Sequence, residues 1–331
     1  MIYMKFGNIE LYSLSDGTHT EDGGGMFEYF PKDIWSNYKV EDKTPYKTDE
    51  NNNILQATNC LLIKHPMGNV LVESGIHDKT PNYVKYHNIV KNPSLIDSIN
   101  SVGMKPSDID IVINSHLNPD HVGWNTVYVN RKLKPTFENA KYVIQKKEFQ
   151  KAANPGFELK NDYFSVEKDV LPLEEFGALE LVNGEKEILP GIYITPTPGH
   201  TAGHQSVIIK AEGKGISFID DLKSRFHLLH LKNYRTEERT MLYAADMAAL
   251  VMHQEKPRCK MAFDVLGREE CWKTKKELLY DMAAENSWFT YLYHEISLNI
   301  GIINKITNAK GEIEYKVKKL RTSYDGSSVM H

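Results

Sequence analysis

Cysteine is scarce in this sequence, with 3 residues among 331. Cys60, Cys259 and Cys271 are odd in number and widely separated, so a disulfide framework of the kind found in small secreted proteins is not expected. The first residues, 1–6, lack the basic start and long apolar middle of a signal peptide. We therefore expect reduced thiols and a cytoplasmic protein.

Long apolar runs and an excess of basic charge are also missing. No stretch of 18 or more apolar residues occurs, which predicts no membrane span. The 40 Lys and Arg residues are balanced by 44 Asp and Glu residues, a net charge of −4. Because a nucleic-acid-binding protein needs a basic face, no nucleic-acid partner is expected, and the basic run at 316–319 is interpreted as a solvated edge.

A hydrophobic content of 41% and a charged content of 25% are ordinary for a folded enzyme. The periodicity of apolar residues predicts a mixed α/β chain without internal repeats. Two polar segments, 18–53 and 159–175, are predicted to be irregular excursions, and the first is expected to fold over the site. Helices are expected at 86–103, 146–152, 236–256 and 270–285. Strands are expected at 1–15, 57–75, 109–113, 141–145, 178–182, 191–195, 205–210, 216–219 and 288–293, with the 178–219 strands forming a second sheet.

The most informative segment combines ligand-type side chains directly after an apolar run. His116, Asn118, Asp120 and His121 follow the apolar segment 109–113. Polar residues at the carboxyl end of a buried strand are where open α/β sheets place their sites. A single histidine is more often structural than a ligand, but this combined spacing favours a metal site over loop capping.

Four other segments contain candidate functional residues. They are Thr197-Pro198-Gly199-His200-Thr201-Ala202-Gly203-His204, Ile216-Ser217-Phe218-Ile219-Asp220-Asp221-Leu222, Tyr291-Leu292-Tyr293-His294-Glu295 and Val70-Leu71-Val72-Glu73-Ser74-Gly75. We interpret His204 as a supporting residue that hydrogen-bonds nearby. Asp264 is expected either to line the pocket or to support a ligand. His227, His230 and His253 are expected to lie at the surface or in a lid, with the alternative that one of them reaches the metal.

Taken together, these segments resemble the metallo-β-lactamase superfamily, whose metal loop usually reads His-x-His-x-Asp-His. Asn118 stands here at the middle histidine, Glu73 at a usual aspartate and Asp220 at a usual glycine. The resemblance implies an α+β fold, the four-layer αββα sandwich, as a single domain over 1–331. Segments 18–53 and 222–260 would be insertions that form a lid or a dimer arm. We expect a homodimer, because the apolar face of a helix at 236–256 needs a partner; packing on its own domain is the alternative.

The resemblance also implies a metal centre with one or two zinc ions per chain. One ligand group would contain His116, Asn118 and His200, a second would contain Asp120, His121 and His294, and Asp221 would bridge them. Asp120 would also be the catalytic residue that orients the nucleophile. Because an amide oxygen is a poorer zinc ligand than imidazole, the group with Asn118 is expected to bind more weakly, to be empty in an enzyme with one metal, or to accept Mn²⁺ or Fe²⁺.

The implied activity is that of a metal-dependent hydrolase. A metal-bound hydroxide would attack a small ester or lactone, as in the lactonase-like branch of the superfamily. Phosphotriester hydrolysis and dehalogenation of an aryl halide on the same site stay open, as do thioester hydrolysis and redox chemistry at a di-iron centre. A different class of function, a non-catalytic binding protein on a decayed hydrolase scaffold, is suggested by the substitutions at Asn118, Glu73 and Asp220. The sequence does not identify substrate-binding residues.

Overall fold

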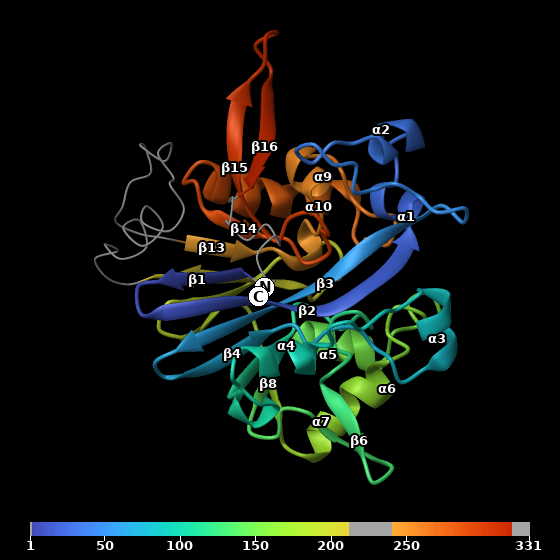
Figure 1. The fold of residues 1–331 in the computed structure, drawn as a ribbon, viewed down its shortest axis with the longest axis vertical. Helices are drawn as coiled ribbons and strands as arrows, with labels where there is room; N and C mark the ends of the chain where they lie inside the picture. The colour runs from blue at the N-terminus through green and yellow to red at the C-terminus, as the bar shows by residue number, and fades with distance from the viewer. Residues whose placement is uncertain (1, 212–239, 320–331) are drawn as a thin grey trace, which may run out of the picture.

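The computed structural model describes residues 2–211 and 240–319. Two mixed β-sheets lie between helices, with α4 (Leu95–Ser101) and α5 (Lys146–Ala153) on one side and α9 (Val251–Glu255) and α10 (Arg268–Lys275) on the other (Figure 1). A shared apolar core contains Val70 and Val112 from one sheet and Val207 and Tyr243 from the other. The predicted four-layer αββα sandwich is therefore confirmed.

The strands of each sheet follow a simple order. The first sheet contains, in spatial order, β1 (Ile2–Phe6), β2 (Ile9–Asp22), β3 (Asn53–His65), β4 (Gly68–Val72), β5 (Ile111–Ile113), β8 (Lys141–Gln145) and β9 (Leu179–Val182). The second contains β10 (Lys186–Leu189), β11 (Ile192–Pro196), β12 (Gln205–Lys210), β13 (Thr240–Tyr243), β14 (Phe289–Tyr291), β15 (Ile300–Thr307) and β16 (Ile313–Lys319). A separate hairpin is formed by β6 (Thr126–Val129) and β7 (Lys132–Pro135).

The remaining helices are short. They are α1 (Gly23–Phe27), α2 (Lys32–Ser36), α3 (Pro81–Tyr86), α6 (Val166–Asp169) and α7 (Leu171–Glu175), with 3₁₀ helices η1 (Pro106–Asp108) and η2 (Ala245–Met247) and the π-helix η3 (Lys276–Ala284). Four of them, α1, α2, α6 and α7, lie in the two predicted excursions. Within the described residues, no helix is long and apolar enough to cross a membrane.

Several sequence-based predictions need correction. The helix expected at 86–103 is only α4, because Pro93 interrupts the pattern and Ser94 starts a new helix by accepting a hydrogen bond from the backbone N–H of Asp97 at 3.2 Å. Strand β9 extends the first sheet rather than the second, since it pairs in parallel with β8. The β15–β16 hairpin was not predicted, and it projects from the body (Figure 1).

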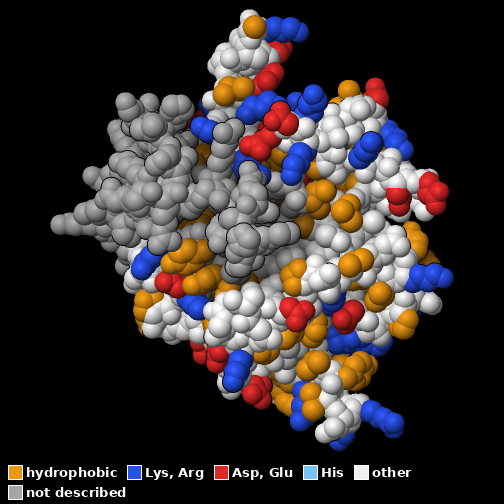
Figure 2. Space-filling model, in the orientation of Figure 1, with side chains coloured by type: hydrophobic (Ala, Val, Ile, Leu, Met, Phe, Trp, Pro, Cys, Tyr) orange, Lys and Arg blue, Asp and Glu red, His pale blue; other side chains and the backbone are white. Residues whose placement is uncertain are grey.

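Charged side chains of both signs are interspersed on the face shown in Figure 2.

The most important correction concerns the helix expected at 236–256. From Thr240 onward this segment forms β13, η2 and α9 instead. Strand β13 is a central strand, flanked by β12 and β14, and Met241 and Tyr243 are buried in the shared core. The apolar run therefore belongs to the sheet, because a central strand buried on both faces has the same composition as a buried helix. The strand expected at 216–219 lies outside the described residues.

Candidate metal centre

Four chain segments converge at one end of the two sheets. His116, Asp120 and His121 lie in the loop after β5, and His200 lies in the connection between β11 and β12. Strands β13 and β14 are parallel, with Tyr243 opposite Tyr291. Asp246 and His294 each lie shortly beyond these paired residues, so parallel pairing brings their side chains to the same end of the sheet.

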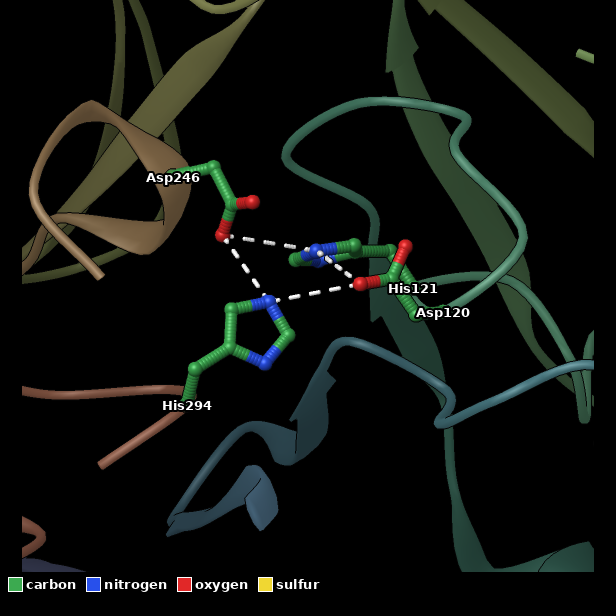
Figure 3. A group of neighbouring side chains, drawn as sticks. All are labelled: Asp120, His121, Asp246 and His294. Carbon is green, nitrogen blue, oxygen red and sulfur yellow. Dashed lines mark ion pairs between the residues drawn. The ribbon is translucent and has the colours of Figure 1, made fainter. Parts of the chain in front are cut away.

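One group of ligand-type side chains contains Asp120, His121, Asp246 and His294 (Figure 3). The Nε2 atom of His294 lies 3.3 Å from Asp120 Oδ2 and 3.4 Å from Asp246 Oδ1. The Nε2 atom of His121 lies 3.4 Å from the same oxygen of Asp246 and 3.7 Å from Asp120 Oδ2. The four side chains thus point toward a common centre, an arrangement that can hold a metal ion.

A second group contains His116, His200 and Asp246. The other carboxylate oxygen of Asp246, Oδ2, lies 3.6 Å from His200 Nε2. Asp246 therefore faces both groups, one oxygen toward each. This is the place that the sequence analysis assigned to Asp221, which lies outside the described residues.

Three of the four candidate histidine ligands hydrogen-bond through Nδ1. The partners are Ser115 Oγ for His116 at 2.8 Å, Asp264 Oδ1 for His200 at 3.0 Å and the Ala57 carbonyl for His294 at 3.1 Å. Nδ1 of His121 lies 3.3 Å from Glu73 Oε1 but has no hydrogen-bond partner among the described residues. A proton held at Nδ1 leaves the Nε2 lone pair directed into the site. The surrounding structure thus orients three of the rings for metal coordination.

Several atoms of the centre are buried without a hydrogen-bond partner. Among the described residues these include Nε2 of His116, His121 and His200, and Oδ1 of Asn118. Buried polar atoms are rarely left unpaired, because each carries a desolvation cost of about 1–3 kcal/mol. A divalent cation at each of the two ligand groups would satisfy these nitrogen atoms.

The electrostatics of the centre favour a cation. Burial raises the pKa of Asp246, but the neighbouring His294 and His121 outweigh this effect and hold the pKa well below its usual value. Burial lowers the pKa of His294, but the charges of Asp246 and Asp120 outweigh it and raise that pKa to about 9. Both carboxylates are thus ionised, and they attract positive charge to the centre.

A buried carboxylate ties the two metal loops together. Glu148 on α5 is fully buried, and its Oε1 atom accepts hydrogen bonds from the backbone N–H of Leu117 at 3.1 Å and from the Tyr163 hydroxyl at 3.0 Å. Its Oε2 atom accepts hydrogen bonds from the Thr201 hydroxyl at 2.7 Å and the Gly203 N–H at 3.2 Å. The loop that contains His116 is thereby joined to the loop that contains His200.

One predicted excursion contributes a side chain beside the centre, because the ring of His19 lies 5.3 Å from the ring of His294. Tyr83 on α3 and His87 are close enough to Asp120 to interact with it electrostatically. The Tyr83 ring also contacts Phe164 of segment 159–175, with a centroid distance of 5.0 Å.

Other predicted residues have clear positions. His204 hydrogen-bonds with Thr197 Oγ1 at 2.7 Å, as expected of a supporting residue. His253 is buried rather than at the surface, and its Nε2 atom lies 2.8 Å from the carbonyl oxygen of Met26. Asp264 supports His200. His227 and His230 lie outside the described residues.

Asp246 is the candidate ligand that sequence reasoning missed. The signal was Met241-Leu242-Tyr243-Ala244-Ala245-Asp246, an apolar run that ends in an aspartate. A second run of the same kind ends at Asp221, and it was chosen instead. Periodicity does not distinguish the two, because the choice depends on which run pairs with β14.

Comparisons with known proteins agree with this geometry. Residues 54–213 match the family model described as the metallo-beta-lactamase superfamily. An N-acyl homoserine lactonase of Bacillus sp. is 26% identical over 167 residues, which cover 47% of this chain and 59% of that relative. The chain thus matches less than two thirds of the relative's length.

Similarity to solved structures extends over nearly the whole chain. A probable metal-dependent hydrolase from Staphylococcus aureus has a TM-score of 0.74 at 22% identity, covering 96% of this chain and 99% of that one. AidC, a dizinc quorum-quenching lactonase in complex with a product, N-hexnoyl-L-homoserine, has a TM-score of 0.66 at 20% identity, with 97% of each chain covered. At these identities the likeness shows the fold.

Proposed function

We propose that this chain, which carries a metallo-beta-lactamase superfamily domain, is a metal-dependent hydrolase that acts on a small ester or lactone. One observation carries the proposal: two groups of buried imidazole and carboxylate ligands share Asp246, and several of their atoms have no hydrogen-bond partner among the described residues. The similarity to N-acyl homoserine lactonases supports the choice of an ester or lactone bond.

The ligand types fit a divalent cation, and we propose zinc because imidazole nitrogen and carboxylate oxygen are its usual ligands. Asp120, His121, Asp246 and His294 would hold one ion. His116, His200 and Asp246 would hold a second, with the Asn118 amide oxygen as a weaker ligand. When bound, such ions supply Lewis acidity, which activates water at neutral pH and polarises a carbonyl or phosphoryl oxygen.

Within this centre, we assign the proton-handling role to Asp120. Its side chain is 20% exposed, whereas those of His121, Asp246 and His294 are 0%, 6% and 2% exposed. The backbone carbonyl of Asp120 accepts a hydrogen bond from the Tyr293 hydroxyl at 2.6 Å, which holds the residue in place. A partly exposed carboxylate at the centre is placed to accept a proton from attacking water and to return it to the leaving oxygen.

The rings beside Asp120 bear on the substrate class. The Tyr83–Phe164 ring pair, of which Tyr83 interacts electrostatically with Asp120, would offer aromatic surface to a neutral substrate with an apolar group. N-acyl homoserine lactones and aryl esters are substrates of this kind.

A homodimer and a cytoplasmic location stay predictions, which sedimentation and cell fractionation would test.

The test is a substrate panel with the purified, metal-loaded chain. The panel contains N-acyl homoserine lactones of increasing acyl length, aryl esters and phosphotriesters. We expect turnover of lactones or esters, and loss of at least about a hundredfold in kcat/KM in Asp120→Ala, since general acid–base groups typically contribute that much or more. Turnover of phosphotriesters alone would overturn the substrate class, and a metal-loaded protein without any turnover would favour the binding protein.

A further inference from the structure

The two ligand groups differ in strength on chemical grounds. The Asp120 group has two imidazoles and two carboxylates, whereas the His116 group has two imidazoles and the shared Asp246. The sequence places a neutral amide, Asn118, between His116 and Asp120, and its Oδ1 atom is buried without a hydrogen-bond partner among the described residues. Amide oxygen is a poorer zinc ligand than imidazole. The His116 group therefore needs another source of affinity if it is to hold an ion.

Asp264 places a charged group directly behind a ligand of the weaker group. Its Oδ1 atom lies 3.0 Å from His200 Nδ1, and its side chain is 7% exposed. Its Oδ2 atom accepts a hydrogen bond from the backbone N–H of Met261 at 3.1 Å. Both carboxylate oxygens are thus held, and the imidazole N–H of His200 is directed at a charge rather than at a neutral oxygen.

The segment that contains Asp264 is tied to His200 by its backbone as well. The N–H of Val265 donates to the carbonyl of His200 at 2.9 Å, and the N–H of Leu266 donates to the carbonyl of Gly199 at 3.0 Å. On the other side, the N–H of Ala262 donates to the carbonyl of Gly25 at 2.7 Å. Residues 261–266 therefore form a strap between α1 and the His200 loop, and this strap holds the Asp264 carboxylate in register with the ring.

His116, the other histidine of the weaker group, has no carboxylate as its Nδ1 partner. His116 Nδ1 is paired with the Ser115 hydroxyl, which is neutral. In the Asp120 group the nearest carboxylate is Glu73, which is fully buried and lies 3.3 Å from His121 Nδ1 without a hydrogen bond to it. Both Glu73 oxygens accept the backbone N–H of Ser115 instead. Among the candidate ligands within the described residues, His200 is therefore the histidine whose Nδ1 hydrogen-bonds with a carboxylate.

We propose that Asp264 is a positioning residue that selectively strengthens metal binding at the His116–His200–Asp246 group and so compensates for the neutral Asn118. The proposal rests on the metal centre of the proposed function. A carboxylate hydrogen-bonded to a ligand imidazole orients the ring and increases its donor strength, and loss of such a partner typically lowers metal affinity about 10–100-fold. Asp264 acts through His200, so its effect is confined to one of the two ions.

The test is a zinc titration of the full chain against a chromophoric chelator. His116→Ala and His294→Ala assign the two equivalents to their groups. We expect Asp264→Asn to weaken the equivalent assigned to His116 by about 10–100-fold and to leave the other unchanged. Asp169→Asn is the matched control, because Asp169 is a buried aspartate paired with His77, a histidine outside both ligand groups, and it should leave both equivalents unchanged. Co²⁺ absorption spectra report the same site selectivity without reference to activity.

Two further variants keep the test decisive if Asp264→Asn does not fold. Asp264→Glu retains the negative charge, so it should bind zinc at the His116 group more tightly than Asp264→Asn does. Asn118→His combined with Asp264→Asn should restore the lost equivalent. Unchanged affinity in Asp264→Asn, an equal loss at both groups, or a wild-type chain with a single equivalent would overturn the inference alone, whereas a wild-type chain that binds no metal would overturn the proposed function as well.

Discussion

Glu148 accepts a hydrogen bond from the Thr201 hydroxyl at 2.7 Å, and this contact joins α5 to the loop that contains His200. The same carboxylate accepts the backbone N–H of Leu117, next to His116. The loop with His116 and the loop with His200 are far apart in sequence, and both hydrogen-bond to the one buried carboxylate of Glu148. The distance between the candidate ligands depends on a residue that is not itself a ligand.

We predict that Glu148→Ala destabilises the fold and loosens the metal centre. The change leaves the buried donors of Leu117, Tyr163, Thr201 and Gly203 without their acceptor, so we expect the free energy of unfolding to fall by about 3 kcal/mol or more. Urea denaturation measures this loss. Glu158→Ala is the control, because the Glu158 side chain is 71% exposed and its removal should change stability by less than about 0.5 kcal/mol. Equal effects of the two substitutions would contradict the prediction.

We predict that Asp246→Asn removes both metal equivalents. Asp246 directs one oxygen toward each ligand group, so the neutral amide weakens both at once. Elemental analysis of the purified variant measures the equivalents per chain. Asp221→Asn is the matched comparison and should keep the wild-type metal content. The opposite result, metal lost in Asp221→Asn and kept in Asp246→Asn, would return the bridging role to Asp221.

We predict that Asn118→His tightens the weaker equivalent by at least about tenfold, or ~1.4 kcal/mol. The physical reason is the replacement of a neutral amide oxygen by an imidazole nitrogen in a loop already shaped for ligands. Competition with a chelator of known affinity measures the change. An unaltered second equivalent would show that position 118 does not contact the ion.

We predict that chelation of the metal lowers the melting temperature of the chain. Ions that bind only the folded state stabilise it by about 4 kcal/mol when the free metal is a thousandfold above its Kd. Without metal, the carboxylates of Asp246 and Asp120 keep the histidine partners found among the described residues. Calorimetry with and without EDTA, followed by zinc readdition, checks the shift. A melting temperature insensitive to both would argue against a metal centre.

We predict that His253 makes the fold less stable in mild acid. Burial lowers the pKa of His253 to about 4, below the ordinary value of 6.5, so the unfolded chain binds its proton first as pH falls. The contribution of His253 to the free energy of unfolding is fully present above pH 6.5 and is lost as pH decreases toward 4. Relative to His253→Gln, which keeps a donor to the Met26 carbonyl, the wild type should lose about 2 kcal/mol between pH 7 and pH 5. Parallel denaturation curves at the two pH values measure the difference, and a constant difference would refute this assignment.

The local parts of the fold were predictable from sequence. The strand at 141–145 and the helix that follows it appear as β8 and α5 at the expected residues. The ligand loop from His116 to His121 lies at the end of β5, because a short apolar run followed by polar residues determines a strand and its exit. These features depend on neighbouring residues, which the sequence displays directly.

Whatever depends on pairing between distant segments required the tertiary structure. The sequence offered two apolar runs that end in an aspartate, and parallel pairing of β13 with β14 places Asp246 beside His294. Asp264 and His200 are likewise joined through a strap that no periodicity reveals. The sequence by itself determined the superfamily resemblance and most candidate ligands, because those reside in short contiguous motifs. The tertiary structure alone decided which carboxylate lies between the two ligand groups and which one supports His200, because non-local strand pairing and loop packing set those distances.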